Sequence, residues 1–250
     1  MLGVTFDHAL GESFYHDQLA GVVEKLQSQG IAVEDGGAVC VFLDGHEAPF
    51  IVRKKDGAFL YATTDLATIH YRLREWQPDA ILYVVDHRQS LHFEQLFSTA
   101  RKMGCGEMEL VHVSFGTVLG EDGKPYKTRS GSAVGLKGLL DEAVERAYEI
   151  AAKSPQITSE DERRTAAKKI GIGAIKYADL AHNRTSDYVF SYDKMLAMNG
   201  NTAAYMQYSN ARVKSIFARG EVNIAALRTS GAKIQFSAPA ERALGLALRE

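Results

Sequence analysis

FLYATTDLATIHYRLREWQPDAILYVVDHRQSLHFEQLFSTARKMG, residues 59–104, is the stretch that decides the fold. Residues 81–85 (ILYVV) have the length and β-branched content of a strand covered on both faces. The segments on either side have the apolar spacing of helices, so the stretch predicts one α/β unit. The strand ends in four polar residues, 86–89. Ligands of open α/β sheets bind beyond the carboxyl ends of the strands, and we therefore expect a binding site there.

Two residues before this strand could belong to the same site. Tyr61 and Asp65 are four residues apart, so they share one helix face if Thr63 or Thr64 caps that helix. A carboxylate beside a phenol suits a cationic ligand. An acidic residue in a first helical turn also complements the helix dipole, and a tyrosine is commonly a core residue. The residues alone leave both interpretations open.

Gln89 and His92 begin the helix that follows the strand. They lie on the face that continues through Phe93 and Leu96. They are therefore either members of the site or the polar start of an amphipathic helix.

The composition favours a globular protein with a buried core and argues against a disulfide-rich or membrane-spanning one. With 250 residues and 46% hydrophobic content, the chain can bury a core as one large or two modest domains. The net charge of -2 offers nucleic acid no overall attraction, so RNA contact would come from local patches. Cys40 and Cys105 cannot form a disulfide scaffold or a zinc site by themselves, which is typical of a reduced, cytoplasmic protein. Residues 1–20 contain no long apolar run, and we expect no membrane span.

The segments before the central unit predict a helix and two antiparallel pairs. The helix begins near residues 13–15 and ends at Gly30. Residues 31–33 and 38–43 form the first pair, and residues 50–53 and 58–60 form a hairpin around Asp56 and Gly57.

A basic loop follows the next predicted strand, residues 109–116. The loop, GEDGKPYKTRSG (120–131), contains Lys124, Lys127 and Arg129. Cations among glycines at a strand end suit a polyphosphate, although a solvated basic loop explains the same residues.

The last part of the chain predicts helices over 136–152, 159–181 and 201–219. Gly171 and Gly173 do not follow a strand, so they are interpreted as small residues that let helices approach, not as a nucleotide fingerprint. Tyr205 and Arg212 belong to an aromatic and basic set that could stack on bases and neutralise phosphates. The same residues could instead be core and rim.

The ordered motifs resemble those of arginyl-tRNA synthetases, the class I enzymes that join arginine to its tRNA. The matching strings include KKDG (54–57), LYATTDLA (60–67), LYVVD (82–86), DGKP (122–125), GIGA (171–174) and NTAAYMQY (201–208). The resemblance covers roughly residues 11–219. It implies the second half of a Rossmann-like α/β catalytic fold with a mainly parallel sheet, followed by an α-helical region.

The resemblance also implies roles at the amino-acid site. Tyr61 and Asp65 would bind the guanidinium group of arginine, and Gln89 would help to hold the amino acid. A buried planar cation needs a carboxylate of matching geometry, which agrees with these roles.

ATP, accompanied by Mg²⁺, is the second substrate that the resemblance implies, with no tightly bound cofactor and no resident metal. His92, Lys124 and Lys127 would bind ATP. Lys124, Lys127 and Arg129 stand at the class I signature loop, whose cations stabilise the departing pyrophosphate.

The resemblance further divides the chain into three parts and implies tRNA as a partner. The parts are 1–135, the carboxy-terminal half of the catalytic domain; 136–200, a helical connecting region; and 201–250, the start of the anticodon-binding domain. The candidate tRNA contacts are Lys176, Arg184, Tyr205 and Arg212.

One departure from the family limits the expected activity. The family's HxGH motif would lie before residue 1, and none of the eight histidines forms a pair at that spacing. We therefore expect an amino-terminal half as a partner, and negligible arginine ligation by this chain alone. The alternatives are a non-catalytic arginine- or tRNA-binding module and a scaffold without ligand affinity.

Overall fold

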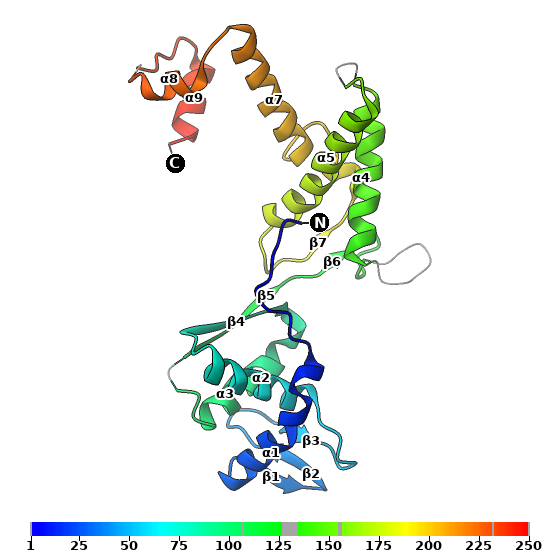
Figure 1. The fold of residues 1–250 in the computed structure, drawn as a ribbon, viewed down its shortest axis with the longest axis vertical. Helices are drawn as coiled ribbons and strands as arrows, with labels where there is room; N and C mark the ends of the chain where they lie inside the picture. The colour runs from blue at the N-terminus through cyan, green and yellow to red at the C-terminus, as the bar shows by residue number, and fades with distance from the viewer. Residues whose placement is uncertain (1, 107, 127–134, 155–156, 232, 250) are drawn as a thin grey trace. The chain divides into compact units, whose positions relative to one another are not determined.

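The computed structural model describes residues 2–106, 108–126, 135–154, 157–231 and 233–249 (Figure 1). The chain divides into two compact units. Unit 1 comprises residues 1–139 and 178–191, and unit 2 comprises residues 140–177 and 192–250. Within the described ranges, no helix has the length and apolarity needed to cross a membrane.

Unit 1 begins with a helical segment and a small antiparallel sheet. The elements are the 3-10 helix η1 (Glu12–Gln18), α1 (Leu19–Ser28), β1 (Val33–Asp35), β2 (Ala38–Val41) and β3 (Phe50–Arg53). Gly30 has a φ of 69° and follows the end of α1, as the sequence predicts. The turn around Gly57 also forms, but its second arm makes only one bridge, between Arg53 and Phe59. The predicted hairpin is therefore reduced to this single bridge, and the strand β3 pairs along its length with β2.

The helices and strands of the central α/β unit form in the predicted order. Its elements are α2 (Tyr61–Glu75), β4 (Ala80–Asp86), η2 (His87–Gln89), α3 (Ser90–Lys102) and β5 (Glu109–Phe115). Strands β4 and β5 are parallel, in register from Ala80 opposite Glu109 to Asp86 opposite Phe115. One continuous apolar core joins this unit to α1 and the small sheet, and its fully buried members include Leu26, Leu66, Ile69 and Leu96.

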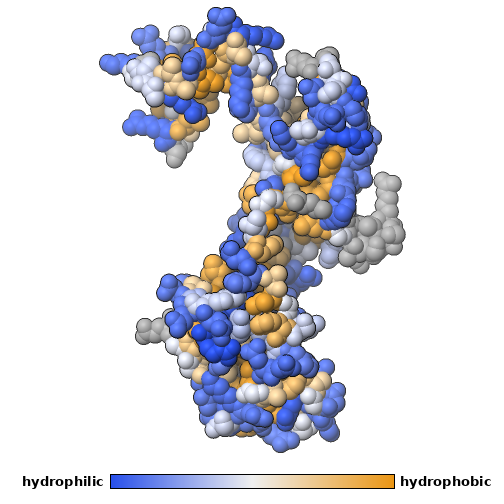
Figure 2. Space-filling model, viewed as in Figure 1, coloured by the Kyte–Doolittle hydropathy of each residue, from blue (hydrophilic) through white to orange (hydrophobic). Residues whose placement is uncertain are grey.

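Strand β4 is covered on one face only, which corrects the prediction of two covered faces. Ile81 is buried, whereas the side chains of Leu82 and Val84, on the opposite face, are 59% and 65% exposed. Hydrophobic residues reach the surface elsewhere in unit 1 as well (Figure 2). The outer edge of β4 has no partner among the described strands. An apolar run predicts a strand, but its neighbours in space decide how many faces are covered.

The start of α2 also differs from the prediction. The helix begins at Tyr61, and Leu60 at the N-cap makes no side-chain cap bond, so neither Thr63 nor Thr64 is the cap. Thr63 is fully buried, and its hydroxyl donates a hydrogen bond to the carbonyl oxygen of Val52. This bond joins α2 to β3.

The remaining strands of unit 1 join its two chain segments, residues 1–139 and 178–191. β6 (Val118–Leu119) pairs in parallel with β7 (Tyr188–Val189). Between β6 and residue 126 the chain makes a tight turn, in which the Gly120 N–H donates to the Lys124 carbonyl oxygen at 2.7 Å.

Unit 2 is helical. The helices are α4 (Leu136–Ala152), α5 (Glu160–Ala181), α6 (Tyr192–Met195), α7 (Ala203–Arg219), α8 (Ile224–Thr229) and α9 (Pro239–Ala247), of which the first residues of α4 and the last of α5 belong to unit 1. The three helices predicted from the sequence are confirmed to within two residues at each end. A Cβ on Gly171 would lie 2.6 Å from the Ala143 carbonyl oxygen, so α4 and α5 pack closely there, as predicted.

Candidate functional site

The shortest contact among the candidate residues joins Asp65 to His92. Asp65 lies in the second turn of α2, and His92 lies in the first turn of α3. The distance between His92 Nε2 and Asp65 Oδ2 is 2.7 Å. An ionised carboxylate can only accept a hydrogen bond, so His92 Nε2 carries the hydrogen. The side chains of His92 and Asp65 are 26% and 30% exposed, so both are partly accessible to solvent.

A buried polar pair borders this contact. The Tyr83 hydroxyl, from β4, and the Arg72 Nε, from α2, are buried without a hydrogen-bond partner in the described part of the chain. Burial raises the pKa of Tyr83, which the Arg72 guanidinium partly offsets and the nearby Asp65 carboxylate reinforces. The Arg72 guanidinium carbon lies 5.6 Å from the centre of the Tyr83 ring. The site prediction missed both residues, although Arg72 lies seven residues after Asp65 and therefore on the same helix face.

Tyr61 and Gln89 lie close in sequence to the helix starts that carry Asp65 and His92. Tyr61 is the first residue of α2, and its side chain is 70% exposed, which excludes the core alternative. Gln89 is exposed at the end of η2. Among the described residues, no hydrogen bond joins either side chain to Asp65. The convergence of all three on one arginine remains a prediction.

Only part of the basic loop can be placed. Lys124 is exposed in the turn after β6, where its N–H donates to Asp122 Oδ1 at 3.1 Å. Gly123 has a φ of 71°, which glycine adopts without strain. Lys127 and Arg129 lie outside the described residues.

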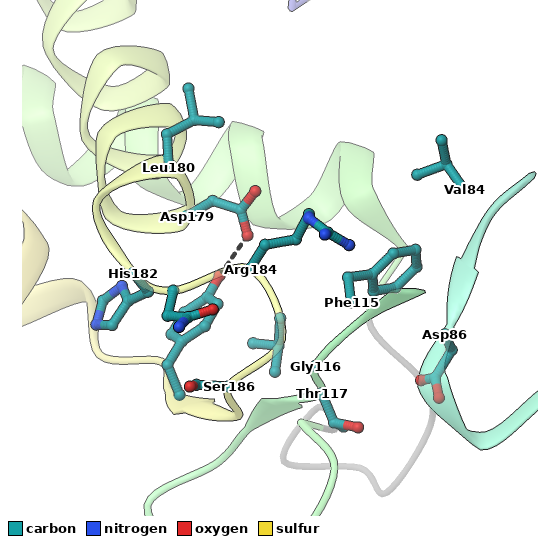
Figure 3. A pocket seen from close by; sticks show the side chains of 13 residues that line it. Val84, Asp86, Phe115, Gly116, Thr117, Asp179, Leu180, His182, Arg184 and Ser186 are labelled. Carbon is teal, nitrogen blue, oxygen red and sulfur yellow. Dashed lines mark hydrogen bonds between the residues drawn. The ribbon is translucent and has the colours of Figure 1, made fainter. Parts of the chain in front are cut away.

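A cavity of about 520 Å³ lies at the carboxyl ends of β4 and β5 in unit 1, on the side of the sheet where a ligand is expected (Figure 3). Its lining includes Asp86, Phe115, Asp179, His182 and Arg184. Figure 3 shows the Arg184 side chain directed toward Phe115. One guanidinium nitrogen of Arg184 donates to the carbonyl oxygen of Ser114.

Two polar contacts organise the walls of this cavity. The Arg88 guanidinium donates to Asp86 at 2.8 Å and lowers the pKa of that carboxyl group to about 2. The Tyr188 hydroxyl donates to Asp179 at 3.2 Å, and the Tyr188 pKa is raised, first by burial and then by that carboxylate. The site prediction missed Asp179 and Tyr188, whose positions depend on a return of the chain to unit 1 after α5.

The other candidate tRNA contacts are exposed on unit 2. Lys176 lies on α5, and Tyr205 and Arg212 lie on α7. The Tyr205 side chain is 40% exposed, so it is a rim residue and not a core residue. Of the residues that the structure describes, no three of His, Cys, Asp and Glu are grouped so that they could hold a metal ion.

Comparison with known proteins places these features in a family. Residues 1–192 match the family model for tRNA synthetases class I (R), catalytic domain. An arginine–tRNA ligase of Rhodopirellula baltica is 57% identical over 224 residues, which cover 87% of this chain and 33% of that protein. An arginine–tRNA ligase of Marinomonas sp. is 48% identical over 259 residues, covering 99% of this chain and 44% of that protein. The chain thus spans less than half the length of these curated relatives.

Solved structures agree with this match. The arginyl-tRNA synthetase of Plasmodium falciparum superimposes with a TM-score of 0.79 and 31% identity, covering 98% of this chain and 41% of that chain. The arginyl-tRNA synthetase of Thermus thermophilus has a TM-score of 0.68 at 22% identity, covering 93% of this chain and 44% of that one, and shows the shared fold alone. The predicted Rossmann-like class I fold is therefore confirmed. Because the family match covers more than half of the sequence, the chain belongs to the class I arginyl-tRNA synthetases.

Proposed function

We propose that this chain contributes to the ATP-dependent joining of arginine to its tRNA. The whole reaction would form arginyl adenylate with release of pyrophosphate and then transfer arginine to the 3′ end of the tRNA. The observation that carries the proposal is the partly exposed Asp65 carboxylate, which one hydrogen bond from His92 holds at 2.7 Å. A carboxylate in such a setting accepts charge-assisted hydrogen bonds from a guanidinium group.

The arginine site would use three side chains. Asp65 would accept hydrogen bonds from the guanidinium nitrogens, and the exposed Tyr61, one helical turn earlier, would contact the same group. Gln89 would hold the amino-acid end, beyond the carboxyl end of β4. This arrangement favours the planar, forked cation of arginine over the compact ammonium group of lysine.

ATP would enter with Mg²⁺ as a substrate complex. Lys124, Lys127 and Arg129 would neutralise the charge that develops on pyrophosphate. The exposure of Lys124 in the turn after β6 supports this role, because its ammonium group is available to a polyphosphate. His92 remains a further candidate for ATP contact.

tRNA would contact both units. Arg184 in unit 1 and Lys176, Tyr205 and Arg212 in unit 2 are exposed, as phosphate-binding and base-stacking side chains must be. We propose the division into a catalytic part (1–135), a connecting part (136–200) and the start of an anticodon-binding part (201–250). Units 1 and 2 have different boundaries, which fall after residues 139, 177 and 191.

This chain alone would bind arginine without ligating it at a measurable rate. It spans 33% to 44% of the length of the relatives named above. A reaction that needs ATP and the arginine carboxylate held in one geometry is fast only when all the groups that position them are together. A non-catalytic arginine- or tRNA-binding module is therefore the second candidate function.

A titration followed by two-dimensional NMR tests the arginine site, since it detects even millimolar binding. We expect arginine to bind the wild-type chain more tightly than lysine does, and Asp65→Ala to weaken arginine binding at least tenfold. Asp44→Ala removes an exposed carboxylate from the same unit and should leave binding unchanged. Equal arginine binding by wild type and Asp65→Ala would refute the site. An electrophoretic shift with tRNA tests the binding-module candidate separately.

A further inference from the structure

We infer that His92 is a positioning residue for arginine recognition, which holds the Asp65 carboxylate in the orientation that accepts the guanidinium group. The inference rests on the arginine site proposed above. It assigns to His92 a role on the amino-acid side of the site, in addition to the ATP contact that the family resemblance implies.

The contact joins two helices at one point. Asp65 and His92 are 27 residues apart in sequence, and their side chains meet at 2.7 Å. Among the described residues, His92 makes the one hydrogen bond that the Asp65 carboxylate receives, and it uses Oδ2. The second oxygen, Oδ1, is therefore left to accept a hydrogen bond from a ligand.

Neighbouring rings hold the imidazole in place. The centre of the His92 ring lies 5.7 Å from that of Phe50 and 5.2 Å from that of Phe93, and both phenylalanines are buried in the core of unit 1. These ring contacts restrict the orientation of the imidazole. Its hydrogen bond in turn restricts the orientation of the Asp65 carboxylate. Rigid support of this kind reduces the entropy that a binding residue loses when the ligand arrives.

The chemistry of the donor also matters. The Nε2–H group of His92 donates to one oxygen of the Asp65 carboxylate and thereby orients the whole group. A lysine or arginine at the same place would compete with the guanidinium group of the ligand. His92 therefore orients Asp65 through Oδ2, and Oδ1 is left for the guanidinium group of arginine.

Two substitutions separate orientation from simple packing. His92→Ala removes the donor, and we expect the arginine dissociation constant to rise about tenfold, as the loss of one orienting hydrogen bond implies. His92→Gln keeps an amide N–H at a similar reach, and we expect it to recover most of the affinity. His16→Ala, an exposed histidine of the same unit, serves as the matched control and should change nothing.

A double-mutant cycle measures whether the effects of the two substitutions on arginine affinity are coupled. A residue with a packing role alone would show no such coupling. In an Asp65→Asn background, adding His92→Ala should cause less than about a twofold further change, because the oriented carboxylate is already lost. The NMR spectrum of each variant reports whether the fold is intact. If the wild-type chain does not bind arginine, the proposed function fails and this inference fails with it.

Two other results would overturn the inference alone. In the first, wild type binds arginine, Asp65→Ala abolishes binding, and His92→Ala binds as wild type does. In the second, His92→Ala and His92→Gln weaken binding equally, and their effects add to that of Asp65→Asn. The second result would reduce His92 to a packing residue of α3.

Discussion

Thr63 illustrates how a single hydroxyl can decide a local structure. Val39 of β2 pairs with Arg53, and Cys40 pairs with Ile51, so Val52 lies at a bulge without a partner in the strand register. The Thr63 hydroxyl donates to the carbonyl oxygen of Val52 in the interior of unit 1. A buried carbonyl group that loses its partner costs free energy, so this bond explains why a polar residue occupies a fully buried position.

Replacing Thr63 by valine should therefore lower the free energy of unfolding by about 1–3 kcal/mol, because the shape is retained while the Val52 carbonyl loses its donor. Thr68→Val is the matched control. The Thr68 hydroxyl donates to the Thr64 carbonyl within α2, an oxygen that the helix already uses, so the loss should stay below about 1 kcal/mol. Urea denaturation measures both, and equal losses would contradict the role assigned to Thr63.

At the scale of elements, small residues determine how closely α4 and α5 pack. Ala143 and Ala147 of α4 and Ala167 and Ala174 of α5 are all 0–1% exposed. A Cβ on Gly171 would lie 2.6 Å from the Ala143 carbonyl oxygen and 2.7 Å from the Val144 nitrogen. Both are backbone atoms, which cannot move aside as the end of a flexible side chain can.

Gly171→Ala should therefore destabilise unit 2 by about 1–3 kcal/mol, because the two helices must move apart. Gly21→Ala in α1 adds the same methyl group where no atom lies within 4 Å, and it should be neutral or stabilise the protein by up to about 1 kcal/mol. Thermal unfolding followed by circular dichroism compares the two variants. A similar effect of both substitutions would show that the packing of α4 against α5 tolerates the added group.

At the scale of the whole molecule, the chain forms two units, and the candidate arginine residues all belong to unit 1. A ligand stabilises the cooperative unit that contains its site. Helix α7 belongs to unit 2, which has its own buried residues. Arginine should therefore affect the two units differently.

Hydrogen exchange measured by mass spectrometry tests this expectation. At arginine concentrations about a hundredfold above the dissociation constant, globally exchanging amides of α2 and α3 should gain protection worth about 2.7 kcal/mol. Amides of α7 should not change. Equal protection in both units would show that they unfold as one, and protection confined to unit 2 would place the arginine site elsewhere.

The fold was largely predictable because its signals are local. Helical spacing predicted α4 and α7, and the apolar runs predicted the strands β4 and β5, whereas their direct parallel pairing is seen only in the structure. The candidate site was predictable only in part. Asp65 and His92 were both identified, but their contact was not, because no local pattern links residues 27 positions apart.

The sequence by itself indicated the family, the order of the main helices and strands, and the candidate residues of the proposed site, because these depend on residue identity and on spacing along the chain. Only the tertiary structure decided that β4 buries one face, that Thr63 bonds Val52 instead of capping α2, and that His92 holds Asp65. Each of these three outcomes depends on which segments meet in space. Burial and hydrogen-bond partners depend on contacts between segments that are far apart in the sequence, and a pattern along the chain does not specify those contacts.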